Sequence, residues 1–226
     1  MKVGYKKLGL VMGAVAALAI LPARADAQVV RYSPIFWSFE GNGGIAIPLG
    51  DLSDAASSGP SFGIAAGYFL NPRLVLRAEG SVDLLGEGDG VTEDPNLTVW
   101  HYTGGIEYHI SDPTQNLLFA FDIGVGGATF DTEVFTVDDF PDAGDQTTGS
   151  FGATYLAGNA GLKVGYNFWR HSATNVPMAT LFLQGDFHLI FADEDDTEFF
   201  AALTGEPAFG TVYEVPITAG IRFNIP

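Results

Sequence analysis

The amino-acid sequence predicts an all-β protein, an eight-stranded antiparallel up-and-down transmembrane β-barrel that is preceded by a cleavable signal peptide. The first observation is that apolar and polar residues alternate with a period of two in successive segments, which is typical of strands with two different faces. The second is that short turns and long loops alternate between these segments, as they do in barrels with an even number of strands. No segment after residue 27 shows sustained helical periodicity.

Residues 1–27 have the three-part layout of a secretory signal peptide. Three lysines form a positive region, and the apolar stretch that follows, Leu8–Leu21, is 14 residues long. A membrane-spanning helix needs about 20 residues, so we expect cleavage, with a retained anchor as the alternative. Small residues place the cut after Ala25 or Ala27. We favour Ala27, which leaves residues 28–226 as one β-barrel domain.

Eight strands follow in chain order, expected near 35–48, 60–71, 73–85, 96–110, 116–130, 151–168, 178–192 and 207–224. The alternation is clearest in the third, fourth and seventh strands. There, apolar side chains or glycine occupy every second position of 74–84, 100–110 and 181–191. The acidic stretch 131–140 is a candidate extension of the fifth strand. Pro216 predicts a β-bulge in the eighth, because proline cannot donate to the ladder.

The connections divide into two kinds. Three are compact and carry turn residues, at 71–73, 111–115 and 169–177. The four between them are long and rich in glycine, serine and acidic residues, at 48–60, 85–96, 131–150 and 192–207. With all short turns on one side, both chain ends are expected on that side, which is the periplasmic side of such a barrel.

The cost of charge decides which face meets lipid. An ionised group that faces hydrocarbon at mid-membrane costs about 2–4 kcal/mol, so the uncharged face should point outward and the polar face should fill the lumen. A soluble barrel of the lipocalin type would reverse this arrangement. Aromatic residues near the expected strand ends favour the membrane, because amphipathic rings gather at headgroup level. They are Trp37, Tyr68, Tyr108, Tyr166, Phe168 and Phe223 on the periplasmic side, and Trp100, Phe130, Phe191 and Tyr213 on the outer side.

Three segments carry a resemblance to a known family. Residues 43–54, Gly-Gly-Ile-Ala-Ile-Pro-Leu-Gly-Asp-Leu-Ser-Asp, resemble the first strand and loop of bacterial outer-membrane β-barrel domains of the OmpA/OmpX type, and 62–81 are similar to their second hairpin. Residues 219–223 resemble the terminal strand that the barrel-assembly machinery reads. In the family the terminal aromatic usually ends the chain, whereas Asn-Ile-Pro follows Phe223 here.

The resemblance implies a small porin-family barrel in the cell envelope of a Gram-negative bacterium, with periplasmic termini. It also implies particular partners: outer-membrane lipids and lipopolysaccharide, the barrel-assembly machinery with Phe223 as its signal, and periplasmic chaperones. A monomer without a cofactor is expected.

The lumen-facing polar residues are the candidate site. By the expected register they are Glu40, Asn42, Arg77, Glu79, Asp83, His101, Glu107, His109, Asp122, Asn159, Lys163, Gln184, Asp186, His188, Glu214 and Arg222. Eight strands leave an interior just wide enough for side chains to fill it. We therefore expect a packed structural network in which the three bases neutralise neighbouring carboxylates. A narrow pathway for cations or small solutes is the alternative, because lumen acids outnumber bases.

Catalytic and metal chemistry find little support in the sequence. His101 and His109 share a face of one strand but lie about 26 Å apart along it, so they cannot bind one metal ion. Asp186 and His188 form a same-face pair without the serine that a lipid-modifying hydrolase would need. No specific metal site and no enzyme activity are expected, and an outer-leaflet lipid-modifying enzyme stays a distant alternative.

The charge of the chain is concentrated in its long loops. The net charge is −17, with 10 Lys+Arg against 27 Asp+Glu, yet 47% of the residues are hydrophobic. Such a composition excludes a disordered chain and makes nucleic acid an unsuitable partner. Cysteine is absent, which excludes disulfides and thiolate metal sites. The long loops contain no Lys or Arg, and their acidic runs are candidate low-specificity sites for divalent cations: Asp138, Asp139, Asp193, Glu194, Asp195 and Asp196.

These observations together favour an integral outer-membrane protein with a structural or surface-interaction role. Long acidic loops would face the exterior, and a polar, plugged lumen would lie below them. The porin-like channel is the second hypothesis and the lipid-modifying enzyme the third, since one barrel fold serves several functions.

Overall fold

The structure is a computed structural model that describes residues 35, 37–50, 52–53, 56–87, 97–132, 135–136, 148–149, 152–192 and 210–225. The expected signal peptide at 1–27 lies outside the described residues. The same holds for the six acidic loop residues proposed for divalent cations. No helix within these ranges is long and apolar enough to cross a membrane.

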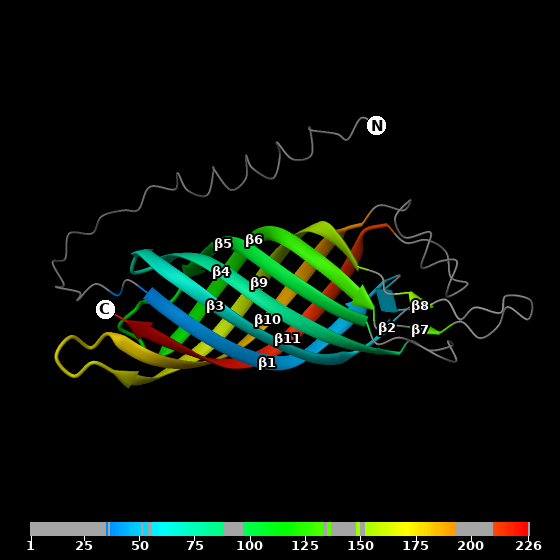
Figure 1. Cartoon of the computed structure of the whole chain (residues 1–226). Coiled ribbons are helices and arrows are strands. Elements are labelled where there is room, and N and C mark those ends of the chain that lie inside the picture. The colour runs from blue at the N-terminus through cyan, green and yellow to red at the C-terminus, as the bar shows by residue number, and fades with distance from the viewer. Residues whose placement is uncertain are drawn as a thin grey trace, which may run out of the picture. The chain divides into compact units, whose positions relative to one another are not determined.

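Eight long antiparallel strands form a closed barrel (Figure 1). They are β1 (Trp37–Leu49), β3 (Gly59–Asn71), β4 (Leu74–Glu87), β5 (Leu97–His109), β6 (Leu117–Thr132), β9 (Gly152–Arg170), β10 (Pro177–Phe191) and β11 (Val212–Ile225). Each pairs with the next long strand along the chain, and β1 pairs with β11 to close the wall. Short strands extend this framework: β2 (Ala56–Ser57) pairs with β4, and β7 (Phe135–Thr136) pairs with β8 (Thr148–Gly149).

All eight expected strands are present, which confirms the predicted fold class. The bounds of most differ from the expected ranges by one or two residues, but β11 begins at Val212, later than expected, and Gly210 and Thr211 precede it outside the strand. The expected continuation of the fifth strand is found in part, because β6 runs to Thr132 and β7 follows at Phe135.

The β-bulge expected at Pro216 is wrong. Pro216 pairs with Ala46 of β1, and the register on that side is continuous. On the β10 side the pairs Gly185↔Ile217 and His188↔Glu214 keep the same register, although the ladder has no pairs between them. Proline removes one hydrogen-bond donor, and here the ladder loses pairs locally without gaining a residue.

The described short turns are held by side-chain hydrogen bonds. Asn71 Oδ1 accepts hydrogen bonds from the backbone N–H groups of Arg73 and Leu74, at 2.8 and 2.9 Å. Asp112 Oδ1 accepts from the hydroxyl of Thr114 at 2.6 Å and from its N–H at 2.8 Å. These bonds hold the pKa of Asp112 below its ordinary value, because they favour the charged carboxylate.

The outer wall is apolar, as predicted for a lipid-facing surface. The most exposed large side chains include Ile64, Leu162 and Leu183, which are 71%, 67% and 63% exposed. Nine of the ten residues assigned to the aromatic belts are exposed on this face. The assignment of Phe130 is wrong, because its ring is only 3% exposed. It has the same parity as Asp122 on β6, so it points inward.

The barrel interior is polar over only part of its length. At the long-loop end it is filled by a hydrophobic cluster, which we call the apolar cap. The cap includes Leu52 from the loop after β1, and Leu85, Val99, Ile190 and Val212 from four strands, all at most 1% exposed. Phe130 packs edge-on against Tyr155 in the same cluster. The expectation that polar side chains fill the whole lumen is therefore wrong at this end.

Candidate functional site

The expected lumen residues lie inside the barrel, where period-two alternation directs them. Arg222, Lys163, Glu107, Glu214 and Asp83 are at most 1% exposed. The other residues assigned to the polar network are also buried, except Glu79, whose side chain is 12% exposed. Asn42 is half-buried. Charged groups so far from water need partners, and two groups of contacts supply them.

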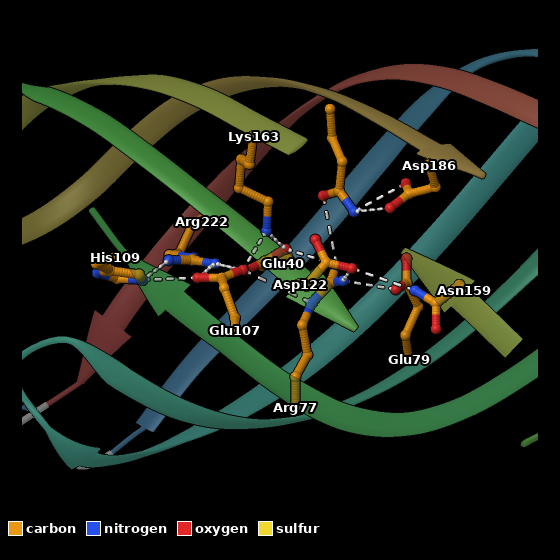
Figure 2. Close-up of polar contacts among 11 residues, drawn as sticks. Glu40, Arg77, Glu79, Glu107, His109, Asp122, Asn159, Lys163, Asp186 and Arg222 are labelled. Carbon is orange, nitrogen blue, oxygen red and sulfur yellow. Dashed lines mark hydrogen bonds and ion pairs between the residues drawn. The ribbon is translucent and has the colours of Figure 1, made fainter. Parts of the chain in front are cut away.

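The first group is a closed ring of two carboxylates and two bases, which we call the ion-pair ring. Lys163 Nζ lies 2.8 Å from Glu40 Oε2 and 2.7 Å from Glu107 Oε2. Arg222 donates from Nε to Glu40 Oε1 at 2.5 Å and from Nη2 to Glu107 Oε1 at 2.5 Å. Acid and base therefore alternate around the ring (Figure 2). His109 adds a contact on one side, with Nε2 2.6 Å from Glu107 Oε1 and 3.1 Å from Arg222 Nη1.

The ring includes contacts that cross the lumen, although Glu40 and Arg222 are direct neighbours on β1 and β11. Arg222 lies on β11 and Glu107 on β5, and these strands are four apart in either direction around the eight-stranded wall. They are therefore diametrically opposite. Lys163 on β9 likewise reaches Glu40 on β1 across the interior. The ring thus ties opposite walls of the barrel together rather than lining one of them.

Arg77 extends the network toward the middle of the barrel (Figure 2). Its guanidinium lies 3.1 Å from Glu40, 2.7 Å from Glu79 and 3.6 Å from Asp122. Nη2 also approaches Gln184 Oε1 on the opposite wall at 3.5 Å. Gln184 donates in turn to both oxygens of Asp186 at 2.9 Å. Within this network the carboxylates Glu40, Glu79, Glu107, Asp122 and Asp186 outnumber the bases Arg77, Lys163 and Arg222.

The second group lies nearer the long loops and consists of Asp83, His101, His188 and Glu214, which we call the quartet. His101 Nε2 lies 3.3 Å from Asp83 Oδ2 and in close contact with Glu214 Oε1. His188 Nδ1 lies 3.1 Å from the same Glu214 oxygen. The imidazole ring centroids are 4.4 Å apart. Candidate ligand atoms from all four residues lie within 4.8 Å of one another.

Sequence reasoning did not bring these four residues together. It compared His101 with His109 on the same strand, and His188 with Asp186 on another. The structure pairs His188 with Glu214 directly across β10 and β11, whereas Asp186 is bonded to Gln184. No described serine is hydrogen-bonded to His188. The signal that could have found the quartet is the strand register, since Asp83 and His101 are also diagonal neighbours across β4 and β5.

Phe223, expected to serve as an assembly signal, lies on the outer face of β11 and is 45% exposed. The strand continues past it to Ile225, which pairs with Trp37. Phe223 therefore lies on the apolar outer face, at the β1–β11 seam that closes the barrel, where it pairs with Phe39.

No protein-family model matches the chain, and no curated protein matches it. Several solved structures do. Neisserial surface protein A is 12% identical with a TM-score of 0.57, and the match covers 84% of this chain and 97% of that one. Ail of Yersinia pestis is 16% identical with a TM-score of 0.49 and coverage of 84% and 100%. A major outer membrane protein from Thermus thermophilus is 13% identical with a TM-score of 0.48 and coverage of 83% and 99%. At this low identity, the similarity to the neisserial protein shows the barrel fold and nothing more specific.

Proposed function

We propose that the protein is an integral outer-membrane barrel of the OmpA/OmpX-like type with a closed lumen, which serves a structural or surface-interaction role through its loops. The observation that carries the proposal is the ion-pair ring. Its Arg222–Glu107 contact joins diametrically opposite strands, and both side chains are at most 2% exposed. A barrel built to conduct would leave this cross-section open to water.

The apolar cap supports closure at a second level. Hydrophobic constrictions block ions by excluding water, and the cap residues Leu85, Val99, Ile190 and Val212 are almost completely buried. A permeating ion would therefore have to cross a dry apolar layer and a network of paired charges. The ring is also expensive to break, because a substitution that removes one partner of a buried ion pair destabilises a protein by about 3–5 kcal/mol.

The competing function is a narrow cation channel. The observation that favours it is the excess of carboxylates over bases in the lumen, which would attract cations once a water path existed. An outer-membrane location, contact with lipopolysaccharide and delivery by the assembly machinery belong to the proposal in either case. The apolar outer wall supports a lipid environment for both.

Single-channel conductance in planar bilayers separates the two functions. Protein refolded without its signal peptide, and shown to be folded by heat-modifiable migration, should leave the membrane silent. Sustained cation-selective conductance from the unmodified protein would contradict the closed lumen. The positive control is a variant that opens both the ion-pair ring and the apolar cap. Glu107→Ala and Arg222→Ala remove one acid and one base of the ring, and Val99→Gly removes a side chain from the cap. This combined variant should conduct, whereas the cap change alone should stay silent.

A further inference from the structure

The quartet is built from two pairs of neighbouring strands that face each other. Asp83 and His101 come from β4 and β5, and His188 and Glu214 come from β10 and β11. Strands β5 and β11 are four apart around the wall and therefore opposite. Two pairs of ligand-type side chains thus converge from opposite walls, each pair with one imidazole and one carboxylate.

The charge of the quartet is not balanced by a permanent cation. Asp83 and Glu214 are both 0% exposed. Their ion-pair partners are the imidazoles of His101 and His188, and no described lysine or arginine forms an ion pair with either carboxylate. The side-chain partners of Asp83 are the imidazole of His101 and the hydroxyl of Ser61, both of which are uncharged in their ordinary form. Oε2 of Glu214 is buried without a hydrogen-bond partner. Buried carboxylates are normally paired with a cation or coordinated to a metal. The three bases of the other network satisfy this rule there but do not reach the quartet.

A dry layer covers the quartet on its loop side. Each member of the quartet has a buried aliphatic residue of the apolar cap two positions away on the same face of its strand. In the order Asp83, His101, His188 and Glu214, these residues are Leu85, Val99, Ile190 and Val212. Water is therefore kept from reaching the two carboxylates from the long loops. Such a hydrophobic shell controls solvent access and lowers the local dielectric, which raises the cost of holding two charged carboxylates close together.

The donor set and its spacing suit one kind of ion. Two imidazole nitrogens and two carboxylate oxygens are ligands of Zn²⁺ and related transition metals, whereas Ca²⁺ and Mg²⁺ prefer oxygen alone. In a tetrahedral Zn²⁺ site with bonds of about 2.0–2.1 Å, neighbouring ligand atoms are about 3.4 Å apart. Two of the separations are close to this value, 3.3 Å for His101 Nε2–Asp83 Oδ2 and 3.1 Å for His188 Nδ1–Glu214 Oε1, while His101 Nε2 and Glu214 Oε1 are in closer contact. No two of the four candidate ligand atoms are more than 4.8 Å apart. A dication would also neutralise the two carboxylates.

We propose that Asp83, His101, His188 and Glu214 form a structural binding site for one Zn²⁺-class divalent transition metal, which fastens the β4–β5 wall to the β10–β11 wall beneath the apolar cap. All four protein ligands would come from the barrel itself, so the coordination shell is closed and the site is structural rather than catalytic. The proposal goes beyond the closed lumen and does not depend on it, since metal binding and conductance are measured separately.

The test uses the untagged mature chain, refolded in detergent with chelator and then freed of chelator. Titration with Co²⁺ alone should give the visible spectrum of a tetrahedral nitrogen–oxygen site that saturates at one ion per barrel, and Zn²⁺ should displace it. Excess Ca²⁺ or Mg²⁺ should not. A barrel that binds no Co²⁺, or binds it with an octahedral spectrum and no saturation, overturns the proposal. In that case the quartet is held by the contacts among its own side chains alone.

Substitutions assign the ion to the quartet. His101→Ala and His188→Ala should each weaken Zn²⁺ binding by more than about 100-fold, since even loss of a group that only orients a ligand costs about 10–100-fold. His171→Ala is the matched control, because His171 lies in the exposed turn between β9 and β10, and it should bind as tightly as the unmodified protein. Equal affinity in all three variants would show adventitious binding and contradict the site. If an alanine variant does not fold, Glu214→Gln keeps the shape of the side chain and should show the same loss.

Discussion

At the scale of single residues, Gly104 and Gly105 show how the curved wall constrains its two faces differently. Gly104 points outward, and a Cβ atom there would meet nothing within 4 Å. Gly105 points into the barrel, where a Cβ would clash with the carbonyl oxygen of Ile123 and lie 2.6 Å from the Cα of Gly124. The strands approach so closely on the inner face that only glycine fits.

Gly105→Ala should therefore lower the free energy of unfolding by about 1–3 kcal/mol, the range for overpacking a buried site. Gly104→Ala is its control on the neighbouring residue. It should be neutral or stabilise by up to about 1 kcal/mol, because alanine restricts the unfolded chain. Urea unfolding of the liposome-refolded variants measures both. Equal stabilities would mean that β5 and β6 separate at little cost.

Residue-level patterns predicted the inner and outer faces well, and the one error is instructive. Phe130 is a candidate for the outer aromatic belt because belts are expected near strand ends. The alternation that places Asp122 in the lumen also places Phe130 there, eight residues later on β6. Parity is the correct guide. Residue type alone does not show which face Phe130 occupies, because the apolar cap places large apolar side chains on the inner face as well at the long-loop end.

At the scale of elements, Arg170 ties together two short turns. Its guanidinium donates from Nε to Asn116 Oδ1 at 3.0 Å, and from Nη1 to the carbonyl oxygens of Asn175 at 2.7 Å and Pro113 at 3.3 Å. It also reaches the carbonyl of Gln115. One side chain at the end of β9 thus fixes both the β5–β6 turn and the β9–β10 turn.

Arg170→Ala should speed amide hydrogen exchange in residues 110–116 and 171–176 while leaving the middle of the strands unchanged. Arg170→Lys should restore little of the protection from exchange, because an ammonium group cannot reproduce the planar, forked set of donors of a guanidinium group. The control is Arg73→Ala in the β3–β4 turn, where the turn hydrogen bonds are made by backbone groups and Asn71. Unchanged exchange in both turns after Arg170→Ala would show that the backbone alone holds them.

The elements and their order could be predicted from sequence, but the partners across the lumen could not. Alternation fixes which residues of a strand point inward, and the up-and-down order fixes which strands are neighbours. The register between β10 and β11 depends on the connection between them, which is too long for a single tight turn to set the register. His188 therefore could not be matched with Glu214 before the ladder was known, and the quartet stayed hidden.

At the scale of the whole molecule, the interior is arranged in layers along the barrel. The ion-pair ring lies toward the short turns, Arg77 and its partners follow, then the quartet, and the apolar cap ends the series at the long loops. The ring and the quartet each join opposite walls. Below the apolar cap, these cross-lumen contacts take much of the place that hydrophobic packing has in a soluble protein.

We expect that removing one partner of an ion pair in the ring lowers the free energy of unfolding more than removing both partners does. Arg222→Met should lower the free energy of unfolding by about 3–5 kcal/mol, because it leaves Glu107 and Glu40 buried with one base fewer. Adding Glu107→Leu should recover much of the loss, since Lys163 can then pair with Glu40 alone.

Trp37, Trp100 and Trp169 are 48%, 50% and 55% exposed on the outer wall, so their fluorescence follows unfolding from lipid without a label. A thermodynamic cycle of the two single variants, the double variant and the unmodified protein isolates the coupling energy. If Arg222→Met is as stable as the unmodified protein, the ring is a consequence of the fold and contributes nothing to holding it. If the double variant is as unstable as Arg222→Met, the unpaired carboxylate of Glu107 is not the cause of the lost stability. A coupling of several kcal/mol between residues on diametrically opposite strands would establish that the interior network holds the two walls together.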